Sequence, residues 1–457
     1  MIGIIFNNTA DFIWSCFFLP ALFLTAIVLT VGCRAMQFFR FGFAMKQTVG
    51  RTLSKAKQSE NNFSPFQAAS TALGSTVGTG NIVGTAQAIC MGGPGALFWL
   101  WCAAVVSMIV KYAEILLAIH FRKQKPGYGP MDYIEHGLGS KRLALAYAGL
   151  ALLSSLAMGN ITQASSITDS FIFAFKSLSN SSSGANITGR IVFGLILCAL
   201  TIILLSGGSK RVGKVAEALV PFMVILFISV CALVITVNIS RLPIVLKTVF
   251  IEAFKPGSIC AGISGLSTAQ CIQWGIRRSA FSNEAGLGTS AIAHASADTT
   301  NAAEQGLWGI FEVFADTIVI CSCTSLCILC SGISIPWGTL CGSEVFVQAI
   351  STVMGQRFSA ILLAVFIGLF AYTSIIGWAF YGSRCCGYIF GKGAEKPYYA
   401  VFSALLIAGS IMPTGTVWQI ADLINALMSI PNLTAVFLLS PLVCHITKRS
   451  FFLTNRL

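Results

Sequence analysis

The segment ALGSTVGTGNIVG, residues 72–84, places four glycines within eleven residues of an otherwise apolar stretch. Each glycine costs about 1 kcal/mol relative to alanine in a helix interior. Close helix packing explains part of the pattern, because Gly74/Gly78 and Gly80/Gly84 are spaced as small-xxx-small pairs. It does not explain the polar side chains at mid-span, which are Thr76, Thr79 and Asn81. An unwound stretch explains both, because it exposes carbonyls to a cation and N–H groups to an anion.

A second segment, RRSAFSNEAGLGTS at residues 277–290, repeats this arrangement. A fully packed helix in hydrocarbon disfavours its Ser-Asn-Glu run, since a carboxylate at mid-bilayer is costly. A glycine-interrupted helix at the start of each of two halves is the sequence sign of an inverted-repeat transporter. The halves are expected at about 66–238 and 268–443, without residue-level identity between them.

The composition places the whole chain in a membrane. Of its 457 residues, 55% are hydrophobic and only 10% are charged, whereas soluble domains carry about 25% charge. The mean hydropathy is +0.80. These values exclude a soluble enzyme and a disordered chain. The net charge of +13 does not indicate nucleic acid, because the Lys and Arg fall mainly between apolar runs, as the positive-inside rule describes.

Eleven membrane spans are expected, in an all-α polytopic fold with one extra N-terminal span before a core of five plus five. They lie near 12–33, 66–90, 95–121, 143–175, 191–206, 214–238, 268–297, 305–331, 357–385, 398–412 and 416–443. The first is expected to be a retained span rather than a cleaved signal, since no Lys or Arg precedes Arg34. Residues 1–65 hold this span and an interfacial segment, residues 239–267 connect the halves outside, and residues 444–457 form a cytoplasmic tail.

The segment 34–57 interleaves basic residues with phenylalanines, which indicates a helix on the cytoplasmic surface. A solvated connecting loop is the alternative. The expected location is a bacterial inner membrane. With this segment inside, the N-terminus lies outside and the C-terminus lies in the cytoplasm. The same orientation places most other cations inside: Arg122, Lys123, Lys125, Lys141, Arg142, Lys210, Arg211, Lys214, Lys392, Lys396, Lys448 and Arg449.

Other site motifs are absent from the sequence. The dinucleotide fingerprint has two residues between its second and third glycines, whereas three residues separate Gly80 from Gly84 in the run that starts at Gly78. No Gly-Lys-Ser/Thr phosphate loop occurs. The 16 Cys and four His show no zinc spacing, so the cysteines are interpreted as reduced packing residues. No nucleophile–base constellation can be assembled, so an enzyme is not expected, and no enzymatic cofactor either.

The glycine-rich segments closely resemble the alanine or glycine:cation symporter family. The resemblance covers about residues 66–443 and rests on the following matches: VGTGNI (77–82) through GGPGALFWLW (92–101), KYAE (111–114), FSNEAGLG (281–288), FADT (314–317), WQIAD (418–422) and PNL (431–433). It implies a leucine-transporter-type fold and sodium-coupled uptake of small neutral amino acids, chiefly alanine and glycine.

An amino-acid zwitterion needs donors for its carboxylate and acceptors for its ammonium. The freed N–H groups of Thr79 and Gly80 open a half-helix that favours the carboxylate, with Asn81 beside them. Carbonyls between Ser282 and Gly286 are candidates for the ammonium. The resemblance adds Gln163 as a substrate-facing amide, for which an interhelical hydrogen bond is the alternative. Trp378 and Phe281 are expected to wall the pocket, although aromatics in spans more often pack in the core or against lipid.

Sodium prefers hard oxygen ligands. By analogy with the fold, the carbonyls of Gly74 and Val77 combine with the hydroxyls of Thr373 and Ser374. The alternative is that these hydroxyls bond the backbone of their own helix. The family more usually has Thr at position 374, and Glu where Ser383 stands, so an inner-gate pairing at Ser383 is in doubt.

The remaining intramembrane charges suggest gating and coupling roles. Arg278 and Asp422 are proposed as an outer-gate ion pair. Lys111 and Glu114, at i and i+3, are expected to satisfy each other on one helix face. Two further carboxylates are either ion-coupling groups or helix-pairing anchors, and they are Glu284 and Asp316.

The leading hypothesis is a secondary active symporter working by alternating access, with a small neutral amino acid, Na+ and the lipid bilayer as partners. A proton-coupled carrier, or one for another small solute, is the second hypothesis. A sensor or channel without coupled turnover is the third. The sequence specifies no oligomeric state.

Overall fold

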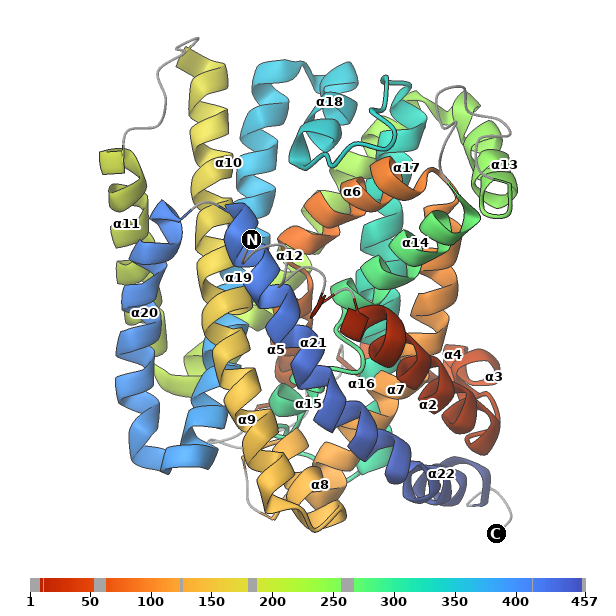
Figure 1. Ribbon diagram of the computed structural model, residues 1–457, viewed down its shortest axis with the longest axis vertical. Coiled ribbons are helices and arrows are strands. Elements are labelled where there is room, and N and C mark those ends of the chain that lie inside the picture. The colour runs from red at the N-terminus through yellow and green to blue at the C-terminus, as the bar shows by residue number, and fades with distance from the viewer. Residues whose placement is uncertain are drawn as a thin grey trace.

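The chain folds as an assembly of helices (Figure 1). The computed structural model describes residues 9–10, 12–52, 63–123, 126–179, 187–255, 267–412 and 414–453. Within these ranges the β structure is limited to one isolated bridge, between Phe63 and Ala297. The predicted all-α class is therefore confirmed.

Eight helical stretches among the described residues are long and apolar enough to cross a membrane. They are Ile13–Gly32, Ala96–Phe121, Lys141–Leu178, Ile187–Leu205, Gly208–Val237, Ala302–Ser331, Gln356–Phe390 and Trp418–Leu438. Each matches one predicted span. The other three predicted spans are the two glycine-rich stretches, which are interrupted, and residues 398–412, of which all but the last lie within the 17-residue helix α20. The total of eleven stays a prediction.

The helices fall into an N-terminal group and two longer series. The first group is η1 (Ile13–Phe18), α2 (Leu19–Gly32), α3 (Met36–Phe39) and α4 (Phe41–Thr52). The next series is α5 (Pro65–Thr76), η2 (Thr79–Asn81), α6 (Val83–Gly92), α7 (Ala96–Phe121), α8 (Pro130–Gly137), α9 (Lys141–Leu156), η3 (Ala157–Ile161), α10 (Thr162–Ser179), α11 (Ile187–Leu205) and α12 (Gly208–Val237).

The last series follows a connection made of η4 (Ile239–Arg241) and α13 (Leu242–Glu252). It comprises α14 (Thr268–Asn283), α15 (Thr289–His294), α16 (Ala302–Val313), η5 (Phe314–Cys321), α17 (Ser322–Ser331), α18 (Ser343–Met354), α19 (Gln356–Phe390), η6 (Lys392–Ala394), α20 (Glu395–Ile411), α21 (Thr414–Leu438), α22 (Ser440–Lys448) and η7 (Arg449–Leu453).

The predicted interfacial segment 34–57 is helical over α3 and α4, while its last two cations, Lys55 and Lys57, lie outside the described residues. Three short helices in connections, α8, α13 and α18, were not predicted. Each is shorter than the roughly 20 apolar residues that mark a span, so hydropathy alone does not reveal it.

The two interrupted helices begin alike and break in the middle. Each first half has a capping box, Ser64 with Gln67 in α5 and Ser267 with Gln270 in α14. The first break separates α5 from α6, and the second separates α14 from α15. In the second break the backbone is left-handed at Glu284, Gly286 and Gly288, with φ of 54°, 89° and 78°. Glycine tolerates this conformation, but a glutamate there is strained.

Burial separates central from peripheral helices. In α7, 83% of the span is buried, against 28% in α11. The exposed positions of α11 carry large apolar side chains such as Ile191, Val192, Leu195 and Ile203, as a lipid-facing helix should. Around α7, α14 packs against α6 and α7, and α15 packs against α5, so the two breaks meet at the centre (Figure 1).

Close approach of α16 to α7 provides a test of this packing. A methyl group at Gly309 would lie 2.8 Å from the carbonyl carbon of Lys111. We therefore expect Gly309→Ala to destabilise the fold by about 1–3 kcal/mol through overpacking, measured as a lower Tm of the purified protein. Gly149→Ala is the matched control, because nothing lies within 4 Å of a methyl group there. An unchanged Tm for Gly309→Ala would contradict the close contact.

Candidate functional site

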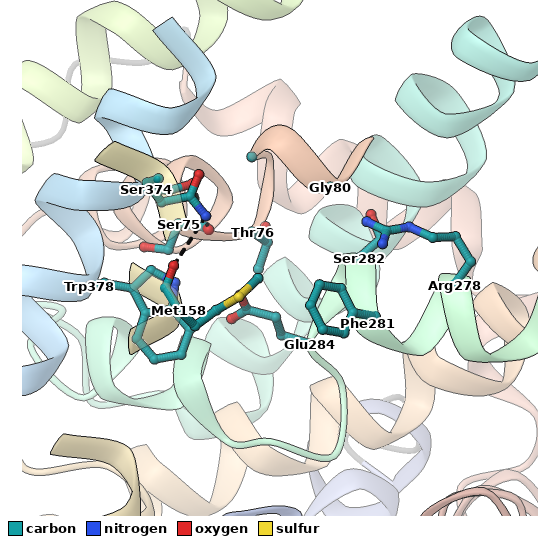
Figure 2. A pocket seen from close by; sticks show the side chains of 12 residues that line it. Ser75, Thr76, Gly80, Met158, Arg278, Phe281, Ser282, Glu284, Ser374 and Trp378 are labelled. Atoms are coloured by element: carbon teal, nitrogen blue, oxygen red, sulfur yellow. Dashed lines mark hydrogen bonds between the residues drawn. The ribbon is translucent and has the colours of Figure 1, made fainter. Parts of the chain in front are cut away.

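A small cavity lies where the two breaks meet (Figure 2). Its free space is about that of one water molecule. Figure 2 shows Phe281 and Arg278 on one side and Trp378 and Ser374 on the other. The lining residues are Ser75, Thr76, Gly78, Gly80, Met158, Gln163, Arg278, Phe281, Ser282, Glu284, Ser374 and Trp378.

Asn81 organises the first break. Its Oδ1 accepts a hydrogen bond from the Gly78 N–H (3.0 Å), which replaces a bond that the interrupted helix lacks. Its Nδ2 donates to Asp316 Oδ1 (2.7 Å) and to Ser282 Oγ (2.9 Å). Among the described residues, no hydrogen bond uses the N–H groups of Thr79 and Gly80. These two donors, at the start of a half-helix, are suited to an anion.

Asp316 joins the two breaks. It lies in the π-helical stretch η5, fully buried, and its carboxylate also accepts from Ser282 Oγ and Thr317 Oγ1, both at 2.8 Å. One carboxylate therefore binds Asn81 of the first break and Ser282 at the end of α14. These are the contacts of a helix-pairing anchor, one of the two roles that the sequence left open.

Two side chains of α7 hold the second break. Lys111 Nζ donates to the Asn283 carbonyl (2.6 Å), and Glu114 Oε1 accepts from the Gly286 N–H (2.9 Å). The predicted pairing of Lys111 with Glu114 is therefore wrong, because each binds a freed backbone group of opposite polarity. The Gly286 carbonyl accepts a hydrogen bond from Asn432 Nδ2 (2.9 Å). It lies outside the cavity lining, although we expected it near the substrate.

A buried polar chain continues from Lys111. Its ammonium lies 3.4 Å from Glu312 Oε2, and Glu312 Oε1 lies 2.5 Å from His294 Nε2. His294 Nδ1 is in turn 2.8 Å from Gln305 Nε2. Because an unpaired buried charge is costly, the Glu312 carboxylate compensates the Lys111 ammonium and holds it against the second break.

The predicted Arg278–Asp422 gate is corrected by one residue. Asp422 pairs with Arg277, at 2.6 Å from Nη2 to Oδ2. Successive residues on a helix point about 100° apart, so only one of two adjacent arginines on α14 can face α21. Arg278 faces the cavity instead.

The predicted sodium ligands lie at the end of α5 and the middle of α19. Ser374 Oγ donates to the Ser75 carbonyl (3.0 Å) and to the Gly74 carbonyl (3.3 Å). Thr373 bonds the backbone of its own helix, at Phe370 and Leu369. It adjoins α5, since a methyl group at Gly74 would lie 3.4 Å from its Cβ, and Val77 follows as the last residue before the break.

The predicted substrate residues lie mostly at the cavity. Gly80, Gln163, Phe281, Ser282 and Trp378 line it. Thr79 lies beside them, with its Oγ1 donating to Gln163 Oε1 (3.3 Å).

Sequence reasoning missed several lining residues, namely Ser75, Thr76, Gly78 and Met158. Met158 lies in the π-helical stretch η3 between α9 and α10, and Gln163 Nε2 donates to its carbonyl (3.2 Å). The adjacent Gly159-Asn160 pair was the available signal, because it interrupts an apolar run.

Ser383 stands where the family more usually has Glu. Its hydroxyl accepts a hydrogen bond from Tyr399 and donates one to the Phe380 carbonyl.

Comparison with known proteins identifies the family of the chain. The model of the sodium:alanine symporter family matches residues 1–453. The chain belongs to this family. It is therefore a multi-pass membrane transporter rather than an enzyme, and membership supports sodium-coupled symport of an amino acid, as the sequence indicated.

Two relatives illustrate the range of the family. The chain is 34% identical to "Sodium/alanine symporter AgcS" of Methanococcus maripaludis, covering 97% of this chain and 96% of that protein. It is 35% identical to "Probable sodium/glutamine symporter GlnT" of Bacillus subtilis, covering 95% and 87%. Among solved structures, MhsT in complex with L-phenylalanine superposes with a TM-score of 0.58 at 14% identity, over 86% of this chain and all of that one. This likeness shows a shared fold.

Glu114 offers a test of how the second break is held. Glu114→Gln retains an acceptor oxygen for the Gly286 N–H, whereas Glu114→Leu removes it. We expect Glu114→Leu to lower the stability by about 1–3 kcal/mol, because buried polar groups lose their partner, and to abolish uptake. Glu114→Gln should lie closer to the wild type in Tm and in uptake. Equal effects of both variants would show that the charge, not the acceptor, matters.

Proposed function

We propose that this symporter takes up small neutral amino acids, alanine and glycine above all, together with sodium, by alternating access. The observation that carries the proposal is the cavity at the two breaks. It combines backbone donors with bulky walls, Trp378, Phe281 and Met158, around very little free space. Such walls favour a substrate with a small side chain over a large one.

The groups at the cavity suit a zwitterion. The N–H groups of Thr79 and Gly80 are oriented for a carboxylate at a half-helix N-terminus. Ser282 and Glu284, which also line the cavity, offer oxygen acceptors for an ammonium group. Glu284 Oε2 already accepts from Thr289 Oγ1 at 2.5 Å, which leaves its other oxygen for a further donor. The Gln163 amide also lines the cavity and accepts a hydrogen bond from Thr79 Oγ1.

Sodium would bind where α5 meets α19. The Gly74 and Val77 carbonyls and the Thr373 and Ser374 hydroxyls provide hard oxygen atoms there. An ion at this place would hold the end of α5 against α19 and so fix the first break. Sodium binding is thereby coupled to substrate binding, because the N–H groups that would bind the substrate carboxylate begin two residues after Val77.

We also infer the orientation. Helices α8 and α22 lie at one end of the molecule, while α13 and α18 lie at the other (Figure 1). The connections rich in Lys and Arg belong to the first end, which would face the cytoplasm under the positive-inside rule.

Proton coupling is the second candidate, and one observation favours it. Glu284 is a buried carboxylate that lines the cavity, so its protonation could replace or join sodium binding. The coupling ion is therefore tested directly.

The test is uptake of labelled alanine into proteoliposomes containing the purified protein. An inward sodium gradient, an inward proton gradient and no gradient are compared, with glycine and glutamine as further substrates. We expect accumulation of alanine and glycine only with sodium, and loss of uptake in Asn81→Ala. Accumulation driven by protons alone would contradict sodium coupling, and preference for glutamine would contradict the small-substrate proposal.

Ser374 tests the sodium site separately. Ser374→Ala removes a hydroxyl oxygen, and we expect the sodium concentration for half-maximal uptake to rise roughly tenfold, as one lost ligand of about 1.4 kcal/mol implies. Ser359→Ala on the same helix is the matched control, because its hydroxyl bonds only the Gly355 carbonyl among the described residues. An unchanged sodium dependence in Ser374→Ala would move the ion elsewhere.

A further inference from the structure

Arg278 is a buried cation whose hydrogen-bonding groups face the cavity. Its side chain is only 9% exposed. Its Nε and Nη2 atoms have no hydrogen-bond partner among the described residues. The guanidinium carbon lies 5.0 Å from the centre of the Phe281 ring, so the aromatic face stabilises the cation but takes none of its N–H groups.

The guanidinium lies against the first break. A methyl group at Gly80 or at Gly84 would overlap its nitrogens, so only glycine at these two positions leaves room for it. The Gly80 N–H, one of the two unused backbone donors, is therefore next to the unused N–H groups of Arg278. Figure 2 shows the guanidinium extended from α14 toward the segment that carries Gly80.

No carboxylate of the described residues forms a direct ion pair with this cation. Asp422 pairs with Arg277. The oxygens of Asp316 accept from Asn81, Ser282 and Thr317. No ion pair within 4.0 Å involves Arg278 in the described ranges. A buried guanidinium without a partner is unfavourable, and arginine is the residue best suited to a bidentate bond with a carboxylate.

We propose that Arg278 binds the carboxylate of the transported amino acid, together with the N–H groups of Thr79 and Gly80. The inference rests on the proposed function, in that the substrate is an amino acid, but not on which side chain it has. The backbone donors fix the position of the carboxylate, and the guanidinium supplies its counter-charge from α14. One anionic group of the substrate then bridges the two interrupted helices.

The test compares alanine with alaninamide, which has the same side chain and ammonium but no negative charge. Binding to purified protein at saturating sodium is followed by ligand-induced thermal stabilisation, which needs no label. The wild type should prefer alanine. In Arg278→Gln, alanine binding should weaken roughly 10- to 100-fold, as expected for a hydrogen-bonded charge pair. Alaninamide binding should change less than about threefold, so the preference collapses.

Two variants serve as controls. Arg278→Lys keeps the charge without the planar fork, and its alanine affinity should lie between wild type and Arg278→Gln. It also provides the measurement if Arg278→Gln does not fold. Arg277→Gln removes the neighbouring arginine, which pairs with Asp422, and should leave the preference for alanine over alaninamide unchanged.

Three results would overturn the proposal. The first is wild-type alanine affinity in Arg278→Gln, and the second is an equal loss for alanine and alaninamide, which would indicate a structural role. The third concerns chloride, which is tested by replacing it with gluconate. If alanine binding depends on chloride in the wild type but not in Arg278→Gln, the anion at Arg278 is chloride rather than the substrate carboxylate. If the wild type binds glutamine but not alanine, the proposed substrate fails instead, and glutamine compared with its α-amide tests Arg278 in the same way.

Discussion

The hydrogen bonds of the Asp316 carboxylate are the interaction on which the two interrupted helices depend. In hydrocarbon, a helix can be interrupted only where other protein groups satisfy the freed backbone. Asp316 binds the amide of Asn81, which itself caps Gly78, and the hydroxyl of Ser282. A single buried side chain on a third helix thus stabilises both interruptions and fixes their separation.

The cavity follows from what this network leaves unsatisfied. Lys111 and Glu114 bind a carbonyl and an N–H group of the second break, so most of that break is structural. In the first break, the N–H groups of Thr79 and Gly80 have no partner in the described part of the chain. We therefore propose that the substrate is recognised at these two donors, beside the cation of Arg278 and between the side chains of Trp378 and Phe281, which line the same cavity.

Much of this could be predicted from local sequence. Glycine clusters with polar neighbours located both breaks, and hydropathy located the eight long spans, because both properties depend on residues close in the chain. The partners of the charges could not be predicted. Lys111 and Glu114 have the spacing of a helical pair, but the backbone of a distant helix binds each of them. Arg277 and Arg278 are indistinguishable in sequence, and only the position of α21 decides which one meets Asp422.

The contact of Gly309 with the backbone of Lys111 has a mechanical consequence. Because no layer of side chains separates α7 from α16 at this point, we expect these two helices to move together rather than slide or rotate against each other. Lys111 and Glu114 on α7 bind the backbone of the second break. Helix α16 continues into η5, whose Asp316 binds Asn81 of the first break. Both interruptions are therefore bound to the same pair of helices, α7 and α16 with its continuation η5. We expect a displacement at one interruption to reach the other through this pair rather than through the lipid-facing helices.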